Sequence, residues 1–494
     1  MPTHVTTPLP AAGRRDRRRA AAPDPAAPRG LLGRAFGLPP GRSALTRETV
    51  AGLTTFFAMS YVIFVNPAIL GLQGTPDASK GLPTAAAVTS TCLLAGVMTL
   101  AMALVSRRAY AIAPGMGVNA VVAYQLVVGA GLTMPQAMGL VVIEGLCIVL
   151  LVVTGIRKRV FEAVPRELKA AIVVGIGFFV LFLGLVNGGI VQKGSGTPVK
   201  LGDLSSPGAL LTVAGILVIG MLMARGFRWA VPAGIVIVTA AAIAINWATG
   251  WKEFPAGTAV LPSSPVGAPD FSLVGAFDFG AFAQIGVAAA VLWIFTMMLS
   301  DFFDSFGTLL GVGKQAGYLD RNDDLPGLNR LLLVDGAAAA VGGAFSTSSG
   351  TAYVESGAGV AAGGRSGWVG VIVALCFLAA IVLHPLVAVV PSCATAPALI
   401  IVGYLMMRTI SEPGLDGRLP IDFRDITFGL PAVLTITMMP LTYSIADGVG
   451  AGFMSYVALR VATGEARRVH PLLYVISGVF AFFFFVPLIQ RLLA

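Results

Sequence analysis

Carboxylic acids interrupt several long apolar stretches of this sequence. Where such a stretch crosses a bilayer, an ionisable side chain costs roughly 2.5–3.5 kcal/mol or more, and such residues usually serve a function. No lysine or arginine clearly falls at the same depth. The pattern therefore indicates an internal acidic site. The acids are Glu144, Asp301, Asp304, Asp335, Glu355 and Asp447.

Three of these acids have informative neighbours. Asp301, Asp304 and Thr308 follow one another at intervals of three and four residues, which places their side chains on one face of a helix. Since lipid cannot solvate that face, we expect it to line a polar cavity. Glu355 follows a run rich in Ser, Thr and Gly. A helix that restarts there would stabilise the carboxylate with its first N–H groups.

The alternative for every acid is a hydrogen-bonded packing or capping role. This alternative is strongest for Glu144, Asp335 and Asp447. Asp304 and Glu355 fit a functional role better, because Asp304 shares a helix face with Thr308 and Glu355 lies just past the run rich in Ser, Thr and Gly.

The sign of the charge restricts the ligand. Carboxylates accept hydrogen bonds, which suits a cation or a neutral ligand rich in N–H donors, whereas an anionic ligand would require Arg or Lys. The amide of Asn119 could both donate and accept against a planar ligand edge. A carboxylate inside a membrane can also take up a proton and couple its movement to transport.

No cofactor, metal or disulfide is expected. The three histidines and four cysteines lack the spacing of metal ligands, and the cysteines fall in or beside apolar stretches. We therefore interpret the cysteines as small packing residues. They are Cys92, Cys147, Cys376 and Cys393.

The elements that carry these residues are apolar segments. Of 494 residues, 56% are hydrophobic and 12% are charged, with a mean hydropathy of +0.85, whereas soluble domains carry about 25% charged residues. This composition predicts a polytopic helical membrane protein. The expected segments are 47–72, 83–106, 110–128, 134–156, 166–190, 207–224, 228–248, 283–312, 328–346, 350–362, 366–390, 391–411, 426–445, 447–462 and 470–493.

The basic residues indicate an orientation. Most of the net charge of +9 comes from arginines that precede the first apolar segment or lie in alternate loops. By the positive-inside rule, the N-terminus should be cytoplasmic and the protein should lie in the plasma or inner membrane. We interpret residues 1–42 as a basic cytoplasmic tail without a fold rather than as a nucleic-acid-binding region.

Two segments are short and interrupted. The third contains Ala111–Ala120, with Pro114 followed by glycines, and the tenth contains Ser346–Gly357. Seven segments separate them, which reverses their direction in the membrane and points to an inverted repeat with a site near the midplane. Simple packing breaks in Gly-rich helices are the alternative.

Several motifs together resemble the AzgA-like hypoxanthine–guanine–adenine permeases of the xanthine/uracil permease (nucleobase–ascorbate transporter) superfamily. The likeness runs from about residue 45 to 462. Ser305 and Ser366 stand where the family pattern would have Thr. The matching stretches are Thr54–Pro67, Ala113–Ala120, Asp304–Thr308, Thr351–Ser356, Ala361–Gly367 and Met439–Gly448.

The resemblance implies fourteen transmembrane segments in two inverted repeats of seven. A core domain would comprise residues 45–160 and 283–390, and a gate domain residues 161–250 and 391–462. Short extended stretches in segments three and ten should meet at the substrate. An additional hydrophobic helix, 470–494, would lie beyond the shared part.

The resemblance also implies roles for individual residues. Glu355 and Asp304 would be the acidic substrate residues, with Asn119 lining the side of segment three. Which of the two segment-eight acids touches substrate stays open. Further substrate-binding candidates are Asp301, Thr308 and Ser356, and the candidates for proton coupling are Asp304, Glu355 and Glu144.

The expected function is secondary transport of a purine nucleobase, with proton symport favoured and sodium coupling left open. Three other functions were weighed: an anion transporter of the same fold, a channel and an intramembrane enzyme. The acidic site disfavours the first, and the absence of a nucleophile–base pair or metal cluster disfavours the third. The choice between a monomer and a homodimer stays open.

Overall fold

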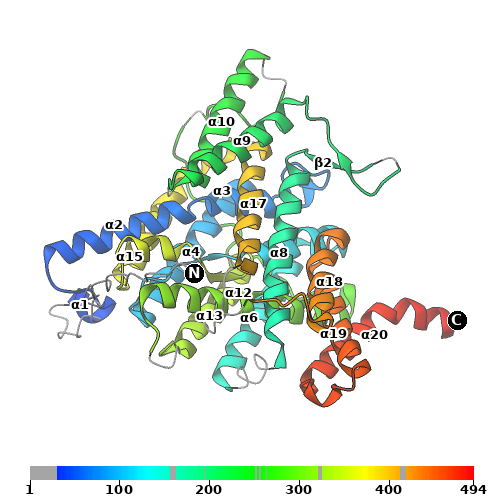
Figure 1. The fold of residues 1–494 in the computed structure, drawn as a ribbon. Helices are drawn as coiled ribbons and strands as arrows, with labels where there is room; N and C mark the ends of the chain where they lie inside the picture. The colour runs from blue at the N-terminus through cyan, green and yellow to red at the C-terminus, as the bar shows by residue number, and fades with distance from the viewer. Residues whose placement is uncertain are drawn as a thin grey trace, which may run out of the picture.

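The computed structural model describes residues 31–155, 163–194, 196–227, 229–250, 253–254, 258–262, 264–320, 325–411 and 419–493. Helices dominate this part of the chain (Figure 1). The first half contains α1 (Leu31–Phe36), α2 (Arg42–Met59), α3 (Val62–Leu70), η1 (Ala78–Lys80), α4 (Thr84–Ser106), β1 (Ile112–Pro114), α5 (Met116–Ala120), the π-helix η2 (Val121–Gly129), α6 (Met134–Val153), α8 (Arg166–Asn187), β2 (Val191–Gln192), β3 (Lys200–Leu201), α9 (Pro207–Ala224) and α10 (Ala230–Ala248).

The second half continues in the same manner and matches the predicted segments closely. It contains α11 (Ala281–Ile285), α12 (Val287–Ala316), α13 (Leu328–Ala344), β4 (Gly350–Ala352), α14 (Ser356–Ala361), α15 (Trp368–Ala380), η3 (Ile381–Leu383), α16 (His384–Ala388), α17 (Ser392–Met407), η4 (Arg408–Ser411), α18 (Ile426–Thr442), α19 (Ile445–Ala462), η5 (Ala466–Arg468) and α20 (Pro471–Leu493).

Polar side chains fix several helix starts. Thr133 and Gln136 form a capping box at the beginning of α6, which satisfies two N–H groups that the helix leaves unpaired. At α18, the hydroxyl and N–H of Thr427 donate to Asp425 and hold the pKa of that carboxyl below its usual value. These caps explain why the predicted starts of segments four and thirteen agree with the structure.

The expectation of an unfolded tail up to residue 42 is wrong for its last part. Leu31–Phe36 form helix α1, and α2 already begins at Arg42. The ring of Phe36 packs edge-on against Trp368 at 6.2 Å, and its carbonyl accepts the Gly367 N–H at 2.8 Å. This long-range contact stabilises a helix that composition alone did not predict. Residues 1–30 of the expected tail lie outside the described residues.

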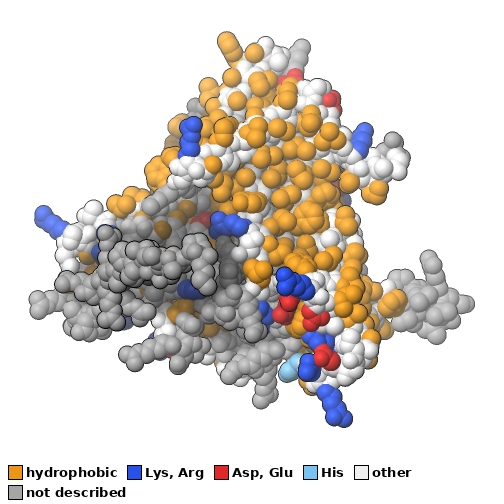
Figure 2. All heavy atoms as spheres, viewed as in Figure 1, with side chains coloured by type: hydrophobic (Ala, Val, Ile, Leu, Met, Phe, Trp, Pro, Cys, Tyr) orange, Lys and Arg blue, Asp and Glu red, His pale blue; other side chains and the backbone are white. Residues whose placement is uncertain are grey.

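Among the described residues, nine helices are long and apolar enough to cross a membrane. Apolar side chains cover much of the face that includes α8, α9, α10 and α17 (Figure 2). Leu210, Leu217 and Val236 are each more than half exposed there. Such a surface would be unfavourable in water but suits contact with lipid.

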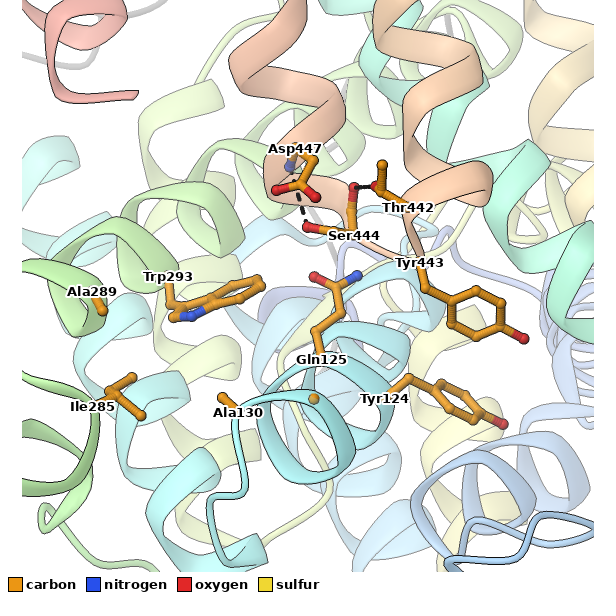
Figure 3. A pocket seen from close by; sticks show the side chains of 11 residues that line it. Tyr124, Gln125, Ala130, Ile285, Ala289, Trp293, Thr442, Tyr443, Ser444 and Asp447 are labelled. Carbon is orange, nitrogen blue, oxygen red and sulfur yellow. Dashed lines mark hydrogen bonds between the residues drawn. The ribbon is translucent and has the colours of Figure 1, made fainter. Parts of the chain in front are cut away.

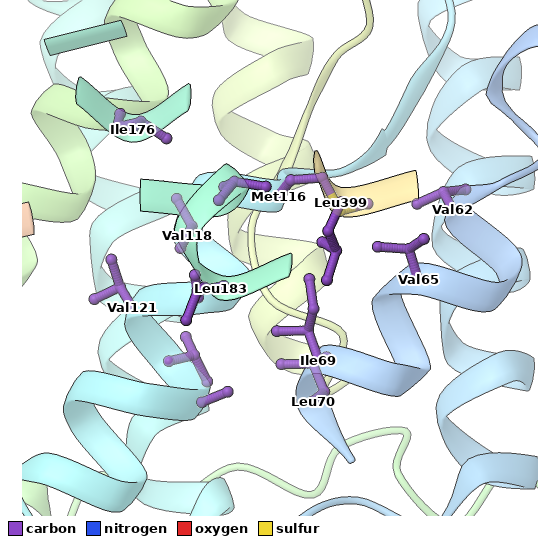
Figure 4. Packing of buried hydrophobic residues seen from close by; sticks show 14 of the residues in the cluster. Val62, Val65, Ile69, Leu70, Met116, Val118, Val121, Ile176, Leu183 and Leu399 are labelled. Carbon is purple, nitrogen blue, oxygen red and sulfur yellow. The ribbon is translucent and has the colours of Figure 1, made fainter. Parts of the chain in front are cut away.

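The helices pack in two groups. One group brings together α2, α4, α6, α12, α13, α14 and α15, and the other α8, α9, α10, α17, α18 and α19. Between them, α3 and α5 contact α17 and α8, and apolar side chains from both groups interdigitate at this contact (Figure 4). Examples are Val65, Val118, Leu183 and Leu399.

A tight contact joins α6 to α13 within the first group. A Cβ added to Gly145 would lie 2.1 Å from the Ala340 nitrogen, and one at Gly343 would lie 2.7 Å from the Val142 nitrogen. We call Gly145 and Gly343 the glycine seam. Small residues allow helix backbones to approach closely in membrane proteins, and here they bring Glu144 against α12 and α13.

The additional C-terminal segment forms the single helix α20. Phe480 packs on Phe453 of α19 with ring centroids 6.3 Å apart, and Gly450 makes room for Phe480. The helix then projects away from the other helices (Figure 1). Its first turns therefore lie against the bundle, an arrangement that the sequence left open.

Candidate substrate site

Segments three and ten meet as a two-stranded antiparallel sheet. β1 pairs with β4 in the register Ile112–Ala352, Ala113–Thr351 and Pro114–Gly350. Further backbone bonds extend the pair at both ends, from Gly115 N–H to the Ser349 carbonyl and from Tyr353 N–H to the Ala111 carbonyl. The expected meeting of two short extended stretches is thereby confirmed. Because each strand is followed by a short helix, this buried sheet interrupts both segments.

Glu355 lies directly before α14, as the sequence predicted. The Tyr61 hydroxyl donates to its Oε1 at 2.8 Å. Asp304 of α12 lies within electrostatic range of Glu355, and both side chains are only partly buried. Two carboxyl groups therefore face the same region beside the strand pair, and both stay accessible to a ligand.

The neighbouring acids instead bind the chain around β4. Ser349 Oγ donates to Asp301 Oδ2 at 2.7 Å, and the Ala352 N–H donates to Asp335 Oδ1 at 2.9 Å. Asp301 and Asp335 are 2% and 1% exposed. The packing role expected for Asp335 agrees with this contact. On the same α12 face, Asp301 is engaged by the protein whereas Asp304 remains open.

Asn119 belongs to a polar network that joins three helices and the loop before β4. Its amide is hydrogen-bonded to Asn66, whose Nδ2 donates to Thr91 at 2.7 Å and to Thr347 at 2.8 Å. Asn119 is fully buried, and its Oδ1 has no hydrogen-bond partner among the described residues. The network holds α5 against α3 and α4 and leaves one amide oxygen as an acceptor.

Ser356 and Thr308 occupy different surroundings. Ser356 is buried, and its hydroxyl accepts the Ala111 N–H at 3.0 Å, which ties α14 to the chain before β1. Thr308 is 9% exposed, one turn beyond Asp304. In this structure Ser356 supports the backbone.

The N–H groups at the beginning of α14 were expected to stabilise the Glu355 carboxylate, but that side chain accepts no capping hydrogen bond from them. Those of Ser356, Gly357 and Ala358 already donate to the carbonyls of Tyr353, Val354 and Glu355. They are therefore not free to hold acceptor atoms of a ligand. The three carbonyls close tight turns because the strand bends directly into the helix.

Sequence reasoning missed the two tyrosines of the site. Tyr61 bonds Glu355, and the Tyr353 hydroxyl bonds the Pro114 carbonyl of β1. Tyr61 falls within the stretch Thr54–Pro67 that matched the family pattern. That match was the available signal, because a contact across 294 residues leaves no periodicity in the sequence.

A cavity of about 580 Å³ lies between η2, the beginning of α12 and the break between α18 and α19 (Figure 3). Asp447, Ser444 and Gln125 give it polar walls, and Trp293 and Tyr443 give it aromatic ones. Asp304 and Glu355 do not line it. Trp293 precedes Asp304 by eleven residues on α12, a rise of about 16 Å.

Comparisons with known proteins show the family and the fold of the chain. The model described as "Permease family", for xanthine/uracil permeases, matches residues 46–413. The chain belongs to the xanthine/uracil permease family. Guanine/hypoxanthine permease PbuO of Bacillus subtilis is 39% identical over 457 residues, which cover 92% of this chain and 99% of that protein. Adenine permease AdeQ of Escherichia coli is 38% identical over 453 residues, which cover 92% and 96%.

Solved structures of transporters share the fold of this permease. The transmembrane domain of the cyanobacterial bicarbonate transporter BicA matches with a TM-score of 0.57 at 14% identity, over 82% of this chain and 98% of that one. The murine anion transporter Slc26a9 matches with 0.59 at 11% identity, over 94% and 77%. At such identity the likeness concerns the fold alone.

These findings confirm the resemblance to the AzgA-like branch and identify the chain as a multi-pass membrane transporter rather than an enzyme. The four cysteines are free. In the described part of the chain, no group of three or more His, Cys, Asp or Glu could hold a metal ion.

Proposed function

We propose that this permease imports purine nucleobases of the hypoxanthine, guanine and adenine class, by proton symport. The observation that carries the proposal is the pair of partly exposed carboxyl groups, Asp304 and Glu355, beside the β1–β4 pair. The names of PbuO and AdeQ support the substrate class. Purine bases are planar and carry ring N–H groups, which carboxylates accept.

The rival substrate class is an inorganic anion, since BicA and Slc26a9 share the fold. None of the ion pairs between described residues involves Asp304 or Glu355. Two carboxylates without a paired cation would repel an anion. The charge of the site therefore supports the purine over the anion.

Within the site, Glu355 and Asp304 would accept the ring N–H groups of the base. The free Oδ1 of Asn119 is a further acceptor for an exocyclic amine, and Thr308 extends the polar face of α12. The engagement of Asp301 by Ser349 favours Asp304 as the segment-eight acid that contacts substrate. We retain Ser356 as a residue that shapes the site through Ala111.

For the layout, we propose fourteen segments in two inverted repeats, with the N-terminus cytoplasmic in the cell membrane. Residues 45–160 and 283–390 would form the core domain, and 161–250 and 391–462 the gate domain. The two packing groups of helices support this division. Movement of one group against the other along the contact in Figure 4 would alternate access to the site.

The cavity of Figure 3 would serve as an entrance vestibule in this scheme. It lies between η2 and α12 of the proposed core and the α18–α19 break of the proposed gate. Its aromatic walls offer stacking surfaces for a planar base on the way to Glu355.

The test is uptake of labelled hypoxanthine in a purine-transport-deficient bacterium that expresses the permease, with each purine base as unlabelled competitor. Labelled sulfate measures the anion alternative in the same cells. We expect saturable hypoxanthine accumulation and no sulfate uptake. Sulfate uptake without purine uptake would overturn the proposal, and purine flux that never exceeds the outside concentration would indicate a channel.

The ion that is coupled to purine uptake is identified by testing which ion gradient drives accumulation. If a proton accompanies the base, uptake should be faster at mildly acidic outside pH, because protonation of a site acid becomes easier there. A protonophore should abolish accumulation, and removal of external sodium should leave it unchanged. Accumulation that follows sodium and ignores the protonophore would contradict proton symport without affecting the purine assignment.

A further inference from the structure

A second pair of carboxyl groups lies where α6 meets α12, apart from Asp304 and Glu355. Glu144 of α6 is fully buried, and its carboxyl group faces that of Asp301. Neither Glu144 oxygen accepts a hydrogen bond from an N–H or O–H group of the described residues. Asp301 uses Oδ2 for the Ser349 hydroxyl, so that its Oδ1 remains for Glu144.

Among the described residues, no positive group compensates this pair. The titratable groups that face Glu144 or Asp301 are Asp335 of α13, Asp304 of α12 and Cys147 of α6, and none is basic. Ion pairs between described residues involve none of these acids. The glycine seam directly beside Glu144 closes α6 onto α13, which keeps water from that side.

Two ionised carboxylates in this setting would be strongly unfavourable. Each would lose its hydration, and their charges would repel at close range. One proton removes both problems, because a protonated carboxyl is a hydrogen-bond donor. A Glu144 O–H would donate to Asp301 Oδ1 and supply the donor that Glu144 lacks. Paired carboxyl groups elsewhere share a proton for the same reason.

We propose that Glu144 and Asp301 share one proton and form the coupling-proton site of this permease, separate from the acids that face the substrate. The inference deepens the proposed proton symport and rests on it. The proton enters from water on one side, resides between the two carboxyl groups, and leaves to water on the other side. No other bond forms or breaks.

Ser349 connects this dyad to the strand pair. Its hydroxyl donates to Asp301, and its carbonyl accepts the Gly115 N–H at the point where β1 leads into α5. Deprotonation would place two negative charges against each other directly beside Ser349. The proton state of the dyad is thereby linked to the geometry of the substrate-facing strands.

The decisive variant is Glu144→Gln, because the amide copies the shape of the protonated acid and can donate to Asp301 permanently. In proteoliposomes that contain the full chain, we expect exchange of labelled hypoxanthine against internal hypoxanthine to persist. Accumulation driven by a pH gradient should be lost, with inside and outside concentrations becoming equal. Glu144→Asp, which keeps a titratable group, should restore accumulation in part, with a shifted pH profile. Asp77→Asn is the charge-matched control, at a partly exposed position between α3 and α4 where Asp77 pairs with Lys80.

A second measurement needs no purine. The infrared spectrum of the purified permease in lipid at neutral pH should contain the carbonyl band of a protonated carboxyl group. We expect that band to weaken in Glu144→Gln and to persist in Asp77→Asn. It detects the shared proton even if the transport variants lose activity, and even if the transported molecule is not a purine.

Two results would overturn the inference. One is a carbonyl band of unchanged intensity in Glu144→Gln. The other is accumulation in that variant with the pH dependence of the unaltered protein. If the unaltered permease moves no purine but shows the band and loses it in Glu144→Gln, the proposed substrate fails while the proton dyad stands.

Discussion

The two interrupted segments meet in one sheet, yet different chemistry holds each of them. The β1 side is bound through its backbone: Thr99 Oγ1 both accepts the Ile112 N–H and donates to the Ile112 carbonyl, each at 2.9 Å. The β4 side is bound through carboxyl and hydroxyl groups, with Asp301 on Ser349 and Asp335 on Ala352. Carboxyl groups of α12 and α13 are therefore gathered around one of the two segments.

This difference separates two tasks, holding the strand in place and presenting acids to a ligand. The β1 side serves only the first, because its strand contains no ionisable group. The β4 side combines acids that bind the protein with acids that remain open, and Glu355 belongs to the open set. Burial of a carboxyl group alone therefore does not make it a candidate substrate residue. Exposure separates the two kinds, since Glu355 also accepts a hydrogen bond, from Tyr61, but remains partly exposed.

The largest effect should come from a change at Glu355, the partly exposed acid beside β4. Glu355→Gln keeps the shape of the side chain but removes its charge. We expect purine uptake to fall by on the order of 100-fold, since hydrogen bonds to charged groups contribute about 1.5–3 kcal/mol. The measurement is initial uptake at equal amounts of protein in the membrane. Full-rate uptake with unchanged apparent affinity would remove Glu355 from the site.

The next test compares an open acid with an engaged one. Asp304→Asn should damage transport more than Asp335→Asn, because an Asn at 335 can still accept the Ala352 N–H through its amide oxygen. The measurement is uptake by the two variants at matched expression. Equal losses would show that engagement by the protein does not separate the two acids.

On the β1 side, Thr99→Val removes both hydrogen bonds to Ile112 without changing the size of the side chain. We expect the protein to lose roughly 1–3 kcal/mol of stability, the cost of leaving a buried backbone group unpaired. Thermal unfolding of the purified protein measures the effect. Thr296→Val is the matched control, since that hydroxyl is equally buried and bonds only within its own helix. A variant as stable as the control would contradict the role given to Thr99.

The smallest effect should follow from Tyr61→Phe. The variant removes the hydroxyl that donates to Glu355 and leaves the ring in place. Because Glu355 can still be satisfied by the substrate, we expect the loss to lie at the lower end for a hydrogen bond to a charged group, about 1.5 kcal/mol, which predicts a rise in KM for uptake of roughly 10-fold. Tyr110→Phe, which loses a bond to the Leu309 carbonyl, should leave KM unchanged. A lower KM in Tyr61→Phe would mean that the hydroxyl competes with substrate for Glu355.

Sequence alone predicted the elements of this fold well and their side-chain contacts poorly. Apolar length located the helices, and Pro114 and Gly350 marked the two breaks. The pairing of Tyr61 with Glu355 was beyond reach, because such a contact depends on how distant helices pack. Helix α1 was missed for the same reason, since Phe36 is fixed by Gly367 and Trp368.

For the site, residue type identified the acids but not their surroundings. Asp301 and Asp304 look equivalent as neighbours on one helix face, and only the positions of Ser349 and Glu144 distinguish them. Ser356 was expected at the substrate, yet its hydroxyl bonds Ala111. Short polar side chains bond whichever backbone group the fold brings near, and local spacing does not encode that choice.

The glycine seam has a consequence for how the sequence can vary. The atom nearest to a new side chain at Gly145 or at Gly343 belongs to the backbone of the facing helix, Ala340 nitrogen in one case and Val142 nitrogen in the other. No single substitution on the partner helix can make room, because every residue type carries the same backbone. In a library that samples all substitutions, both positions should be depleted of every replacement, alanine included, and second-site revertants on the facing helix should be absent.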